Sequence, residues 1–338
     1  MHVAARMIGI SDTGIVVIGR NEAKRLRVCL TSLPNDTPIC YVDSASDDGS
    51  PAIARSCSIP TLQLSSSEPF GAARARNAGF NSLLNQYPKL ERVFFIDGDC
   101  VLDPDFLLVA ARVMDKNDDC AIVVGRLEEC NPVNNIYGML ADLEWSNPAF
   151  GEIVDFGQLG GIMLVRVVDF MAVGGFNPDF IAGEDSELGI RLHLTGRKTI
   201  RISNRMAIHA MEMQQFSQWW RRSIRAGHAL AHRNAVHGKS SLADSRAAAR
   251  STLVYGILIP IILLTAVPIL GIGGLVPVII YVYLGSRFFS FYRSKGASRR
   301  NSLIGAAYGV IAKLANGLGM IRFHVQRAQG SYKIIEYK

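Results

Sequence analysis

The stretch Val93-Phe94-Phe95-Ile96-Asp97-Gly98-Asp99 decides the predicted fold. Four apolar residues in a row are typical of a strand that is covered on both faces, as in a parallel sheet. Open α/β sheets bind ligands beyond the carboxyl ends of their strands. Two neighbouring carboxylates repel each other unless a cation lies between them, and oxygen ligands suit Mg²⁺ or Mn²⁺. Asp97 and Asp99 therefore predict a metal site at a sheet edge, with an ordinary Asp-Gly turn as the alternative.

Segments on both sides of this strand predict a doubly wound sheet. Short apolar runs alternate with helical patterns, which indicates an α/β fold with a mostly parallel sheet. Strands are expected at residues 14–19, 39–43, 61–64, 93–97, 120–125 and 161–166, with a helix following each of the first three.

Charge divides the 338-residue chain into an acidic front and a basic rear. Residues 1–196 hold 15 Lys and Arg against 26 Asp and Glu, a net charge of −11. Residues 197–338 hold 21 against 3, a net charge of +18. A basic rear suits nucleic acid or anionic lipid, and the apolar segments of the rear favour lipid, so no nucleic-acid partner is expected. All six cysteines precede residue 131 without a Cys-x-x-Cys pair, which indicates reduced thiols in the cytosol.

The rear of the chain predicts a transmembrane hairpin at 251–292. Thr252 to Leu270 and Leu275 to Ser286 carry no charge, and the four residues 271–274 contain three glycines. Basic residues flank both ends, which predicts that both ends and the preceding domain, residues 1–240, lie in the cytoplasm. A buried helix pair in a soluble core is the alternative. Residues 301–325 predict an amphipathic interfacial helix or a third membrane helix.

Several polar residues of the front half are candidates for chemistry, and each also has a structural interpretation. Asp43 ends a predicted strand, where it can contact a nucleobase or ribose, or close an Asx turn or helix cap. Arg76 suits a diphosphate or an exposed helix start. Gly161 belongs to a glycine pair that allows close approach to a ring or sugar, or simply makes a tight turn.

Two further candidates lie later in the chain. Asp185 precedes an apolar helical pattern, where an acid is favoured by the helix dipole and can also act as a general base. His209 ends a predicted strand and is either structural or a ligand that completes a metal shell. The rear adds Gln218, Trp219, Arg221 and Arg222, which suit sugar stacking and phosphate binding or an interfacial belt at a membrane.

The order of the motifs over residues 12–235 resembles family-2 glycosyltransferases of the GT-A fold. The motifs are Val-Val-Ile-Gly-Arg-Asn-Glu, Val-Asp-Ser-Ala-Ser-Asp-Asp-Gly-Ser, Ala-Arg-Asn-Ala-Gly, Asp-Gly-Asp, Val-Gly-Gly-Phe and Gly-Glu-Asp. The resemblance implies that Asp185 is the catalytic base and that Asp99, with His209, holds Mg²⁺ or Mn²⁺. It also implies donor contacts, for which the candidates are Asp43, Arg76, Asp97, Gly161 and Glu184.

The implied reaction is an inverting transfer of one sugar from a nucleotide-diphosphate donor, with UDP favoured, to a hydroxyl group. Processive relatives carry Gln-x-x-Arg-Trp, whereas this chain has Arg222 in place of the final Trp, which favours single addition. The tail is similar to those of membrane-attached enzymes that build bacterial exopolysaccharide or lipid-linked glycans. This implies a lipid-linked or glycan acceptor at the bacterial inner membrane.

Two other functions compete with this interpretation. A sugar nucleotidyltransferase also uses carboxylates and Mg²⁺ at a sheet edge, but it needs a Gly-rich, basic loop after the first strand. Residues 19–22, Gly-Arg-Asn-Glu, fit that loop poorly. A non-catalytic membrane scaffold gives no reason for acids at three separate strand or helix ends.

Overall fold

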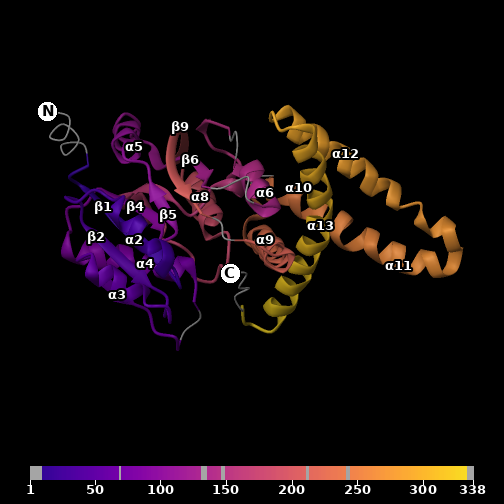
Figure 1. The fold of residues 1–338 in the computed structure, drawn as a ribbon, viewed down its shortest axis with the longest axis horizontal. Coiled ribbons are helices and arrows are strands. Elements are labelled where there is room, and N and C mark those ends of the chain that lie inside the picture. Colours follow the sequence, from indigo (N-terminus) through magenta and orange to yellow (C-terminus); the bar gives the residue numbers. More distant parts are fainter. Residues whose placement is uncertain are drawn as a thin grey trace. The chain divides into compact units, whose positions relative to one another are not determined.

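The computed structural model describes residues 10–67, 70–130, 135–145, 149–210, 213–240 and 244–332 (Figure 1). The chain folds as two compact units. The first comprises Met1–Cys130 and Pro148–Ala210, and the second comprises Asn131–Asn147 and Met211–Lys338. The predicted domain limit at residue 240 stays a prediction, and residues 211–240 group with the second unit.

Among its described residues, the first unit is built on a nine-stranded sheet whose first half is parallel. Val93 to Ile96 are fully buried, as expected for a strand covered on both faces. The strand order reverses between β1 and β4, and ligands of such sheets bind beyond the carboxyl ends at this point. The parallel strands, in spatial order, are β3 (Thr61–Gln63), β2 (Ile39–Asp43), β1 (Thr13–Gly19) and β4 (Arg92–Asp97).

The second half of the sheet is mixed. β8 runs antiparallel to both of its neighbours, β4 and β6. Apolar runs look alike in parallel and antiparallel strands, so the sequence predicted β8 without its direction. The remaining strands, with β8 (Met163–Arg166), are β6 (Cys120–Glu129), β9 (Lys198–His209), β5 (Cys100–Leu102) and the short β7 (Gly151–Glu152) beside β9.

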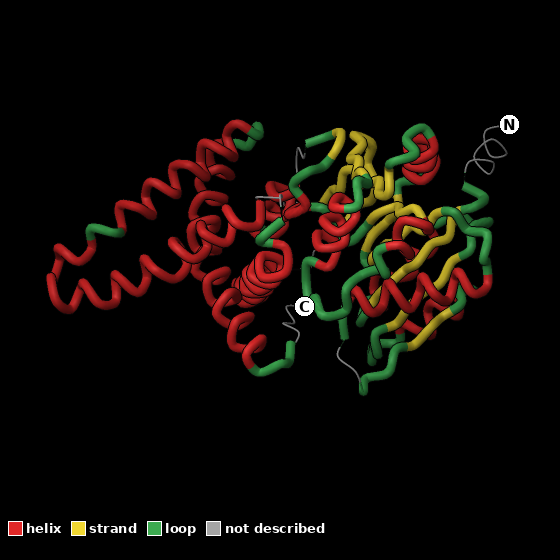
Figure 2. Tube along the Cα trace, turned by 180° about the vertical axis from the view of Figure 1, so that it is seen from behind, coloured by secondary structure: helices red, strands yellow, loops and turns green. Residues whose placement is uncertain are grey.

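Helix α4 (Ala72–Gln86) packs closely on the parallel half of the sheet, beside β1 and β2 (Figures 1 and 2). A Cβ atom on Gly79 would lie 2.4 Å from Cγ1 of Val16, so only glycine permits this approach. The other helices of the unit are α2 (Ala23–Thr31), α3 (Ser50–Ser56), α5 (Phe106–Asp115), α7 (Val167–Ala172), α8 (Glu184–Leu194) and the 3₁₀ turn η1 (Phe156–Gln158).

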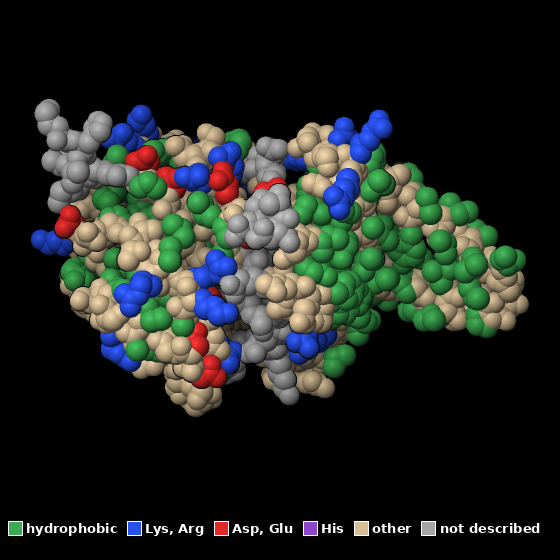
Figure 3. All heavy atoms as spheres, viewed as in Figure 1, with side chains coloured by type: hydrophobic (Ala, Val, Ile, Leu, Met, Phe, Trp, Pro, Cys, Tyr) green, Lys and Arg blue, Asp and Glu red, His purple; other side chains and the backbone are tan. Residues whose placement is uncertain are grey.

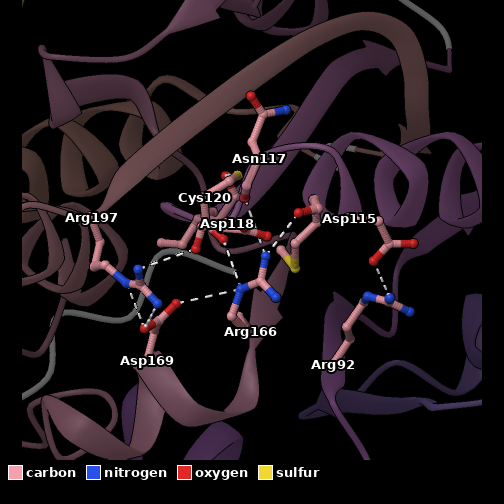
Figure 4. A network of polar contacts seen from close by, with 10 residues as sticks. Arg92, Asp115, Asn117, Asp118, Cys120, Arg166, Asp169 and Arg197 are labelled. Atoms are coloured by element: carbon pink, nitrogen blue, oxygen red, sulfur yellow. Dashed lines mark hydrogen bonds and ion pairs between the residues drawn. The ribbon is translucent and has the colours of Figure 1, made fainter.

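A polar network fixes the edge of the sheet at which β4 begins and β8 ends (Figure 4). The Arg166 guanidinium donates to the carbonyls of Met114 at 2.8 Å and Cys120 at 3.1 Å. Asp169 pairs with Arg197 at 2.5 Å, while Arg92 pairs with Asp115. The three arginines are thus bonded to neighbouring protein groups. The network stabilises the sheet edge at the start of β4, whereas Asp97 lies at the end of that strand.

The second unit is helical. Its long helix α13 packs against α9, where Trp219 lies edge-on to Tyr308 with ring centroids 4.8 Å apart, and against α12. The predicted hairpin is present as two helices joined by a 3₁₀ turn (Figure 2). The elements are α6 (Ile136–Trp145), α9 (Phe216–His237), α10 (Asp244–Leu253), the π-helix η2 (Val254–Leu258), α11 (Ile259–Leu270), η3 (Gly271–Leu275), α12 (Val278–Ser294) and α13 (Arg299–Ala328).

Two helical stretches among the described residues are long and apolar enough to cross a membrane. They are Arg246–Leu275, with 6% of its most apolar window buried, and Arg299–Ala328, with 33% buried. Hydrophobic side chains cover the projecting hairpin on the face that Figure 3 shows. Length and composition also fit a helix of a soluble core, so membrane attachment stays a prediction.

Candidate active site

The guanidinium of Arg76 joins carboxylates from two distant parts of the first unit. Its Nη2 lies 2.9 Å from Oδ1 of Asp97, and its Nη1 lies 2.6 Å from Oε1 of Glu184. Burial lowers the pKa of Arg76, but the carboxylates of Asp97, Glu184 and Asp185 outweigh burial and raise that pKa above its ordinary value. Arg76 therefore stays charged and holds the end of β4 to the start of α8.

The neighbouring Asn77 explains why Arg76 lies at this point. Its side-chain amide donates to the carbonyl of Phe176 at 2.7 Å, and its Oδ1 accepts from the Phe176 N–H at 2.9 Å. The Arg76 guanidinium lies 5.5 Å from the centroid of the Phe176 ring. The Ala-Arg-Asn and Val-Gly-Gly-Phe motifs therefore form one contact, which the sequence did not reveal because the motifs lie about 100 residues apart.

Gly161 leaves space for the guanidinium of Arg76, because it has no side chain. A Cβ atom at Gly161 would lie 2.1 Å from Nη2 of Arg76, well inside any van der Waals contact. The structure thus gives this glycine a close-approach role against a protein side chain. Its predicted contact with the donor sugar stays a prediction.

Asp185 lies in the first turn of α8, directly after Glu184. Its Oδ2 accepts a hydrogen bond from the backbone N–H of Gly160 at 2.7 Å, which fixes the direction of the carboxylate. Burial and the charge of Glu184 raise the pKa of Asp185, although the residue keeps partial contact with solvent. A raised pKa makes this carboxylate a stronger proton acceptor than an ordinary aspartate.

Helix α8 is anchored by a second arginine that the sequence analysis did not assign to the site. Arg191 forms a two-pronged ion pair with Glu187, at 2.7 and 2.8 Å. The same guanidinium donates to the carbonyls of Val173 and Gly175 at 2.5 and 2.6 Å. The helix that carries Asp185 is thereby fixed to the glycine turn that contacts Asn77.

Asp99 directly precedes β5, His209 is the last residue of β9, and their side chains lie close together. Oδ2 of the buried Asp99 is 3.4 Å from Nε2 of His209, and the antiparallel pairing of β5 with β9 sets Cys100 opposite His209. Together with Cys100, these residues form a group whose ligand atoms lie within 4.8 Å of one another. A carboxylate and an imidazole both suit Mn²⁺, whereas a thiol suits softer metals. Asp99 and His209 therefore fit the predicted metal site, whereas the Cys100 thiol does not.

Glu129 is a neighbour of this pair that no motif indicated. The parallel register of β6 and β9 sets Glu129 beside His209, and its Oε2 lies 3.5 Å from Nδ1 of the imidazole. Only the register of two strands separated by 80 positions brings them together, so no local sequence signal was available.

Asp43, the last residue of β2, is fully buried. Its carboxylate accepts from the Ser46 hydroxyl at 2.6 Å, from the Ser46 N–H at 2.9 Å and from the Tyr41 hydroxyl at 3.1 Å. These bonds match the turn-forming alternative for Asp43. Its contact with a nucleotide stays a prediction.

The four candidate acceptor- or diphosphate-binding residues at 218–222 belong to the second unit, and three of them contact other protein groups there. Gln218 caps α9 by accepting from the N–H groups of residues 214 and 215, and Trp219 is buried in the helical core. Arg222 forms a two-pronged ion pair with Glu144 at 2.8 and 3.0 Å, while Arg221 is exposed. Their predicted contact with acceptor or diphosphate stays a prediction.

Comparison with known families identifies the class of protein. Residues 14–166 match the family described as Glycosyl transferase family 2, and residues 92–290 match Glycosyl transferase family group 2. The second match spans more than half of the chain. The chain therefore belongs to glycosyltransferase family 2, and it is an enzyme of that family with the GT-A fold.

Solved structures support the fold. The mannosyltransferase PcManGT from Pyrobaculum calidifontis, in complex with GDP-Man and Mn²⁺, is similar with a TM-score of 0.55 and 18% identity, covering 88% of this chain and 86% of that one. TarS residues 1–349 from S. aureus is similar with a TM-score of 0.50 and 14% identity, covering 95% and 92%. The comparison with curated proteins gave no match.

Removing the charge of Arg76 should destabilise the first unit. Arg76→Met leaves Glu184 buried without its cation, and breaking such a pair costs about 3–5 kcal/mol. Arg74→Met on the same helix changes a less buried arginine and should cost about 1 kcal/mol or less. Chemical denaturation of both variants measures the difference, and equal losses would contradict the structural role of Arg76.

Proposed function

We propose that the chain is an inverting, metal-dependent glycosyltransferase that moves one sugar from a nucleotide-diphosphate donor to a hydroxyl group. One observation carries this proposal: Arg76 holds Asp97 beside Glu184 and Asp185. Asp99 follows Asp97 by two residues and lies against His209. These contacts support a site at the carboxyl end of β4 in which Asp185 is the proposed base and Asp99 and His209 are the proposed metal ligands.

Asp185 acts as the base in the proposed reaction. It takes the proton of the acceptor hydroxyl while the hydroxyl oxygen attacks the anomeric carbon of the donor sugar. The bond from that carbon to the diphosphate oxygen breaks, so the configuration inverts and a nucleoside diphosphate leaves. The Gly160 N–H aims the carboxylate, and the raised pKa of Asp185 supports its role as a proton acceptor.

Asp99 and His209 are the proposed ligands of Mg²⁺ or Mn²⁺. When bound, such an ion neutralises the negative charge that develops on the departing diphosphate. PcManGT was solved with Mn²⁺ and GDP-Man, which supports a metal-dependent reaction in this fold. Arg76 adds a fixed positive charge beside Asp97 and Glu184.

UDP-sugars are the favoured donors, because they are the common choice in the family, and the GDP-Man of PcManGT makes GDP-sugars the second candidate. A thermal-shift screen of UDP, GDP and dTDP and their sugars with Mn²⁺ identifies the donor, since a ligand at 100 times its Kd stabilises by about 2.7 kcal/mol. Release of nucleoside diphosphate distinguishes sugar transfer from nucleotidyl transfer, which releases pyrophosphate.

The hairpin 251–292 is the proposed membrane anchor, with the catalytic domain on the cytoplasmic side of a bacterial inner membrane. Its exposed apolar side chains and flanking arginines support this role. Residues 301–325, which α13 contains, are proposed as an interfacial helix, because one face of α13 packs on α9. An enzyme held there suits a lipid-linked or glycan acceptor.

Asp185→Asn should abolish transfer while donor binding stays nearly unchanged, because the amide cannot take a proton but keeps the size of the side chain. Turnover and donor affinity are measured separately, with the exposed Asp179→Asn as the matched control. Normal turnover of Asp185→Asn would show that another group is the base.

The rate of transfer should fall at acidic pH as Asp185 becomes protonated. Because the pKa of Asp185 is raised, the fall should begin above the pH range of an ordinary aspartate. Glu184→Gln removes a charge that raises this pKa, so the acidic limb of the pH–rate profile should move to lower pH. If the acidic limb stays in place or moves to higher pH, the charge of Glu184 does not raise the pKa of Asp185 as proposed.

Asp99→Ala should remove the dependence of donor binding on Mn²⁺. Calorimetric titration of nucleoside diphosphate with and without Mn²⁺ measures this dependence, and Asp36→Ala, an exposed aspartate, serves as control. The wild type and the control should bind more tightly with Mn²⁺, whereas Asp99→Ala should show one affinity in both conditions. Retained enhancement in Asp99→Ala would place the metal elsewhere.

A further inference from the structure

We infer that the hairpin 251–292 enters the bilayer from one side and turns back inside it, without crossing to the far side. The inference rests on the membrane attachment proposed above and adds the depth of insertion. It concerns α11, the turn η3 and the first half of α12.

The uncharged stretch of the hairpin is too short to cross the bilayer twice. It comprises the 36 residues 251–286, bounded by Arg250 and Arg287. The return arm, residues 276–286, offers 11 residues, or about 16 Å of helix, against a hydrocarbon core of about 30 Å. A turn on the far side would draw the exposed Arg287 into the hydrocarbon, which is costly.

The base of the hairpin is packed on α13, which shortens the free part of the outgoing arm as well. A Cβ atom on Gly256 would lie 2.2 Å from the carbonyl oxygen of Lys313, so η2 lies directly against α13. The hydroxyl of Tyr281 donates to the carbonyl of Tyr255 at 2.6 Å and so joins α12 to η2 at the base of the hairpin. Beyond this base, α11 has 12 residues, or about 18 Å, which is little more than one leaflet.

The turn itself is suited to hydrocarbon. Residues 266–280 contain no polar side chain, and Ile269 and Ile272 are 78% and 88% exposed. Backbone donors of the turn bind inside the chain: the N–H of Val276 bonds to Gly273 O at 3.3 Å, and the N–H of Ile279 bonds to Val276 O at 3.1 Å. Internally bonded backbone is what a lipid environment requires. An apolar turn exposed to water on the far side of the membrane would not be stabilised by burial in hydrocarbon.

Charge complementarity favours an anionic bilayer as the partner of this surface. No Asp or Glu occurs between Asp244 and Glu336, whereas Arg246 and Arg250 precede the hairpin and Arg287, Arg293 and Lys295 follow its apolar part. Cations close to an apolar inserting segment match anionic head groups above acyl chains. A second copy of the chain would bring the same cations together, so self-association is the less favourable partner.

Cysteine labelling tests the depth of the turn. Ile272→Cys and Ser294→Cys are made in the full chain and expressed in bacteria, and intact cells and inverted membrane vesicles are treated with a membrane-impermeant maleimide. Peptide mapping separates the new cysteines from the six native ones. Cys at 272 should stay unlabelled from both sides and react only in detergent, whereas Cys at 294 should react in inverted vesicles. Labelling at 272 in intact cells would overturn the inference.

A charge at the turn gives a second readout. Ile272→Asp should lower the membrane-bound fraction about tenfold or more, because the turn lies in hydrocarbon. Val28→Asp, a matched change at an exposed site of the first unit, should leave that fraction unchanged. Undiminished membrane binding of Ile272→Asp would overturn the inference, since a turn in far-side water tolerates the charge. A soluble wild type would instead refute the membrane attachment itself, and a soluble dimer would identify self-association as the role of the surface.

Discussion

The arrangement of the candidate site depends on one buried guanidinium between two carboxylates. Arg76 reaches Asp97 and Glu184, which lie 21 and 108 positions further along the chain. A buried charge is tolerated only when it is paired, so the pairing fixes how β4, α4 and α8 meet. Asp185 also acts on the charge of Arg76, so three carboxylates face a single arginine. The excess of negative charge is the physical reason for expecting a divalent cation there.

Small residues and backbone contacts make that pairing possible. Gly79 brings α4 onto the sheet, and Gly161 leaves room for the guanidinium itself. Asn77 and Arg191 then clamp the same glycine turn from two helices. In this chain the Ala-Arg-Asn and Val-Gly-Gly-Phe motifs thus hold each other in place, and Arg191 fixes α8, which carries Asp185, to the same turn.

Much of the fold could be predicted from local pattern. The apolar runs that became β1, β2 and β4 were located within a residue of their observed limits, because fully buried strands give continuous apolar sequence. The direction of β8 could not be predicted, since it depends on long-range pairing.

The ion pairs of the site could not be predicted either, because the sequence indicated Asp97, Arg76 and Glu184 only as separate candidates. Glu129 had no local signal at all, because strand register alone sets it beside His209. Asp43 and Gln218 show the opposite case, where a side chain singled out for ligand contact is bonded to the turn that follows its strand or to its own helix cap.

The central claim is that Asp99 and His209 hold a divalent cation beside the carboxylates that Arg76 organises. The most direct measurement is a crystal structure of the chain with Mn²⁺ and a nucleoside diphosphate, with anomalous diffraction recorded at the manganese absorption edge. The account predicts one anomalous peak about 2.0–2.3 Å from ligand atoms of Asp99 and His209 and in contact with the diphosphate. A peak away from both residues, or a bound diphosphate with no metal beside it, would contradict the account.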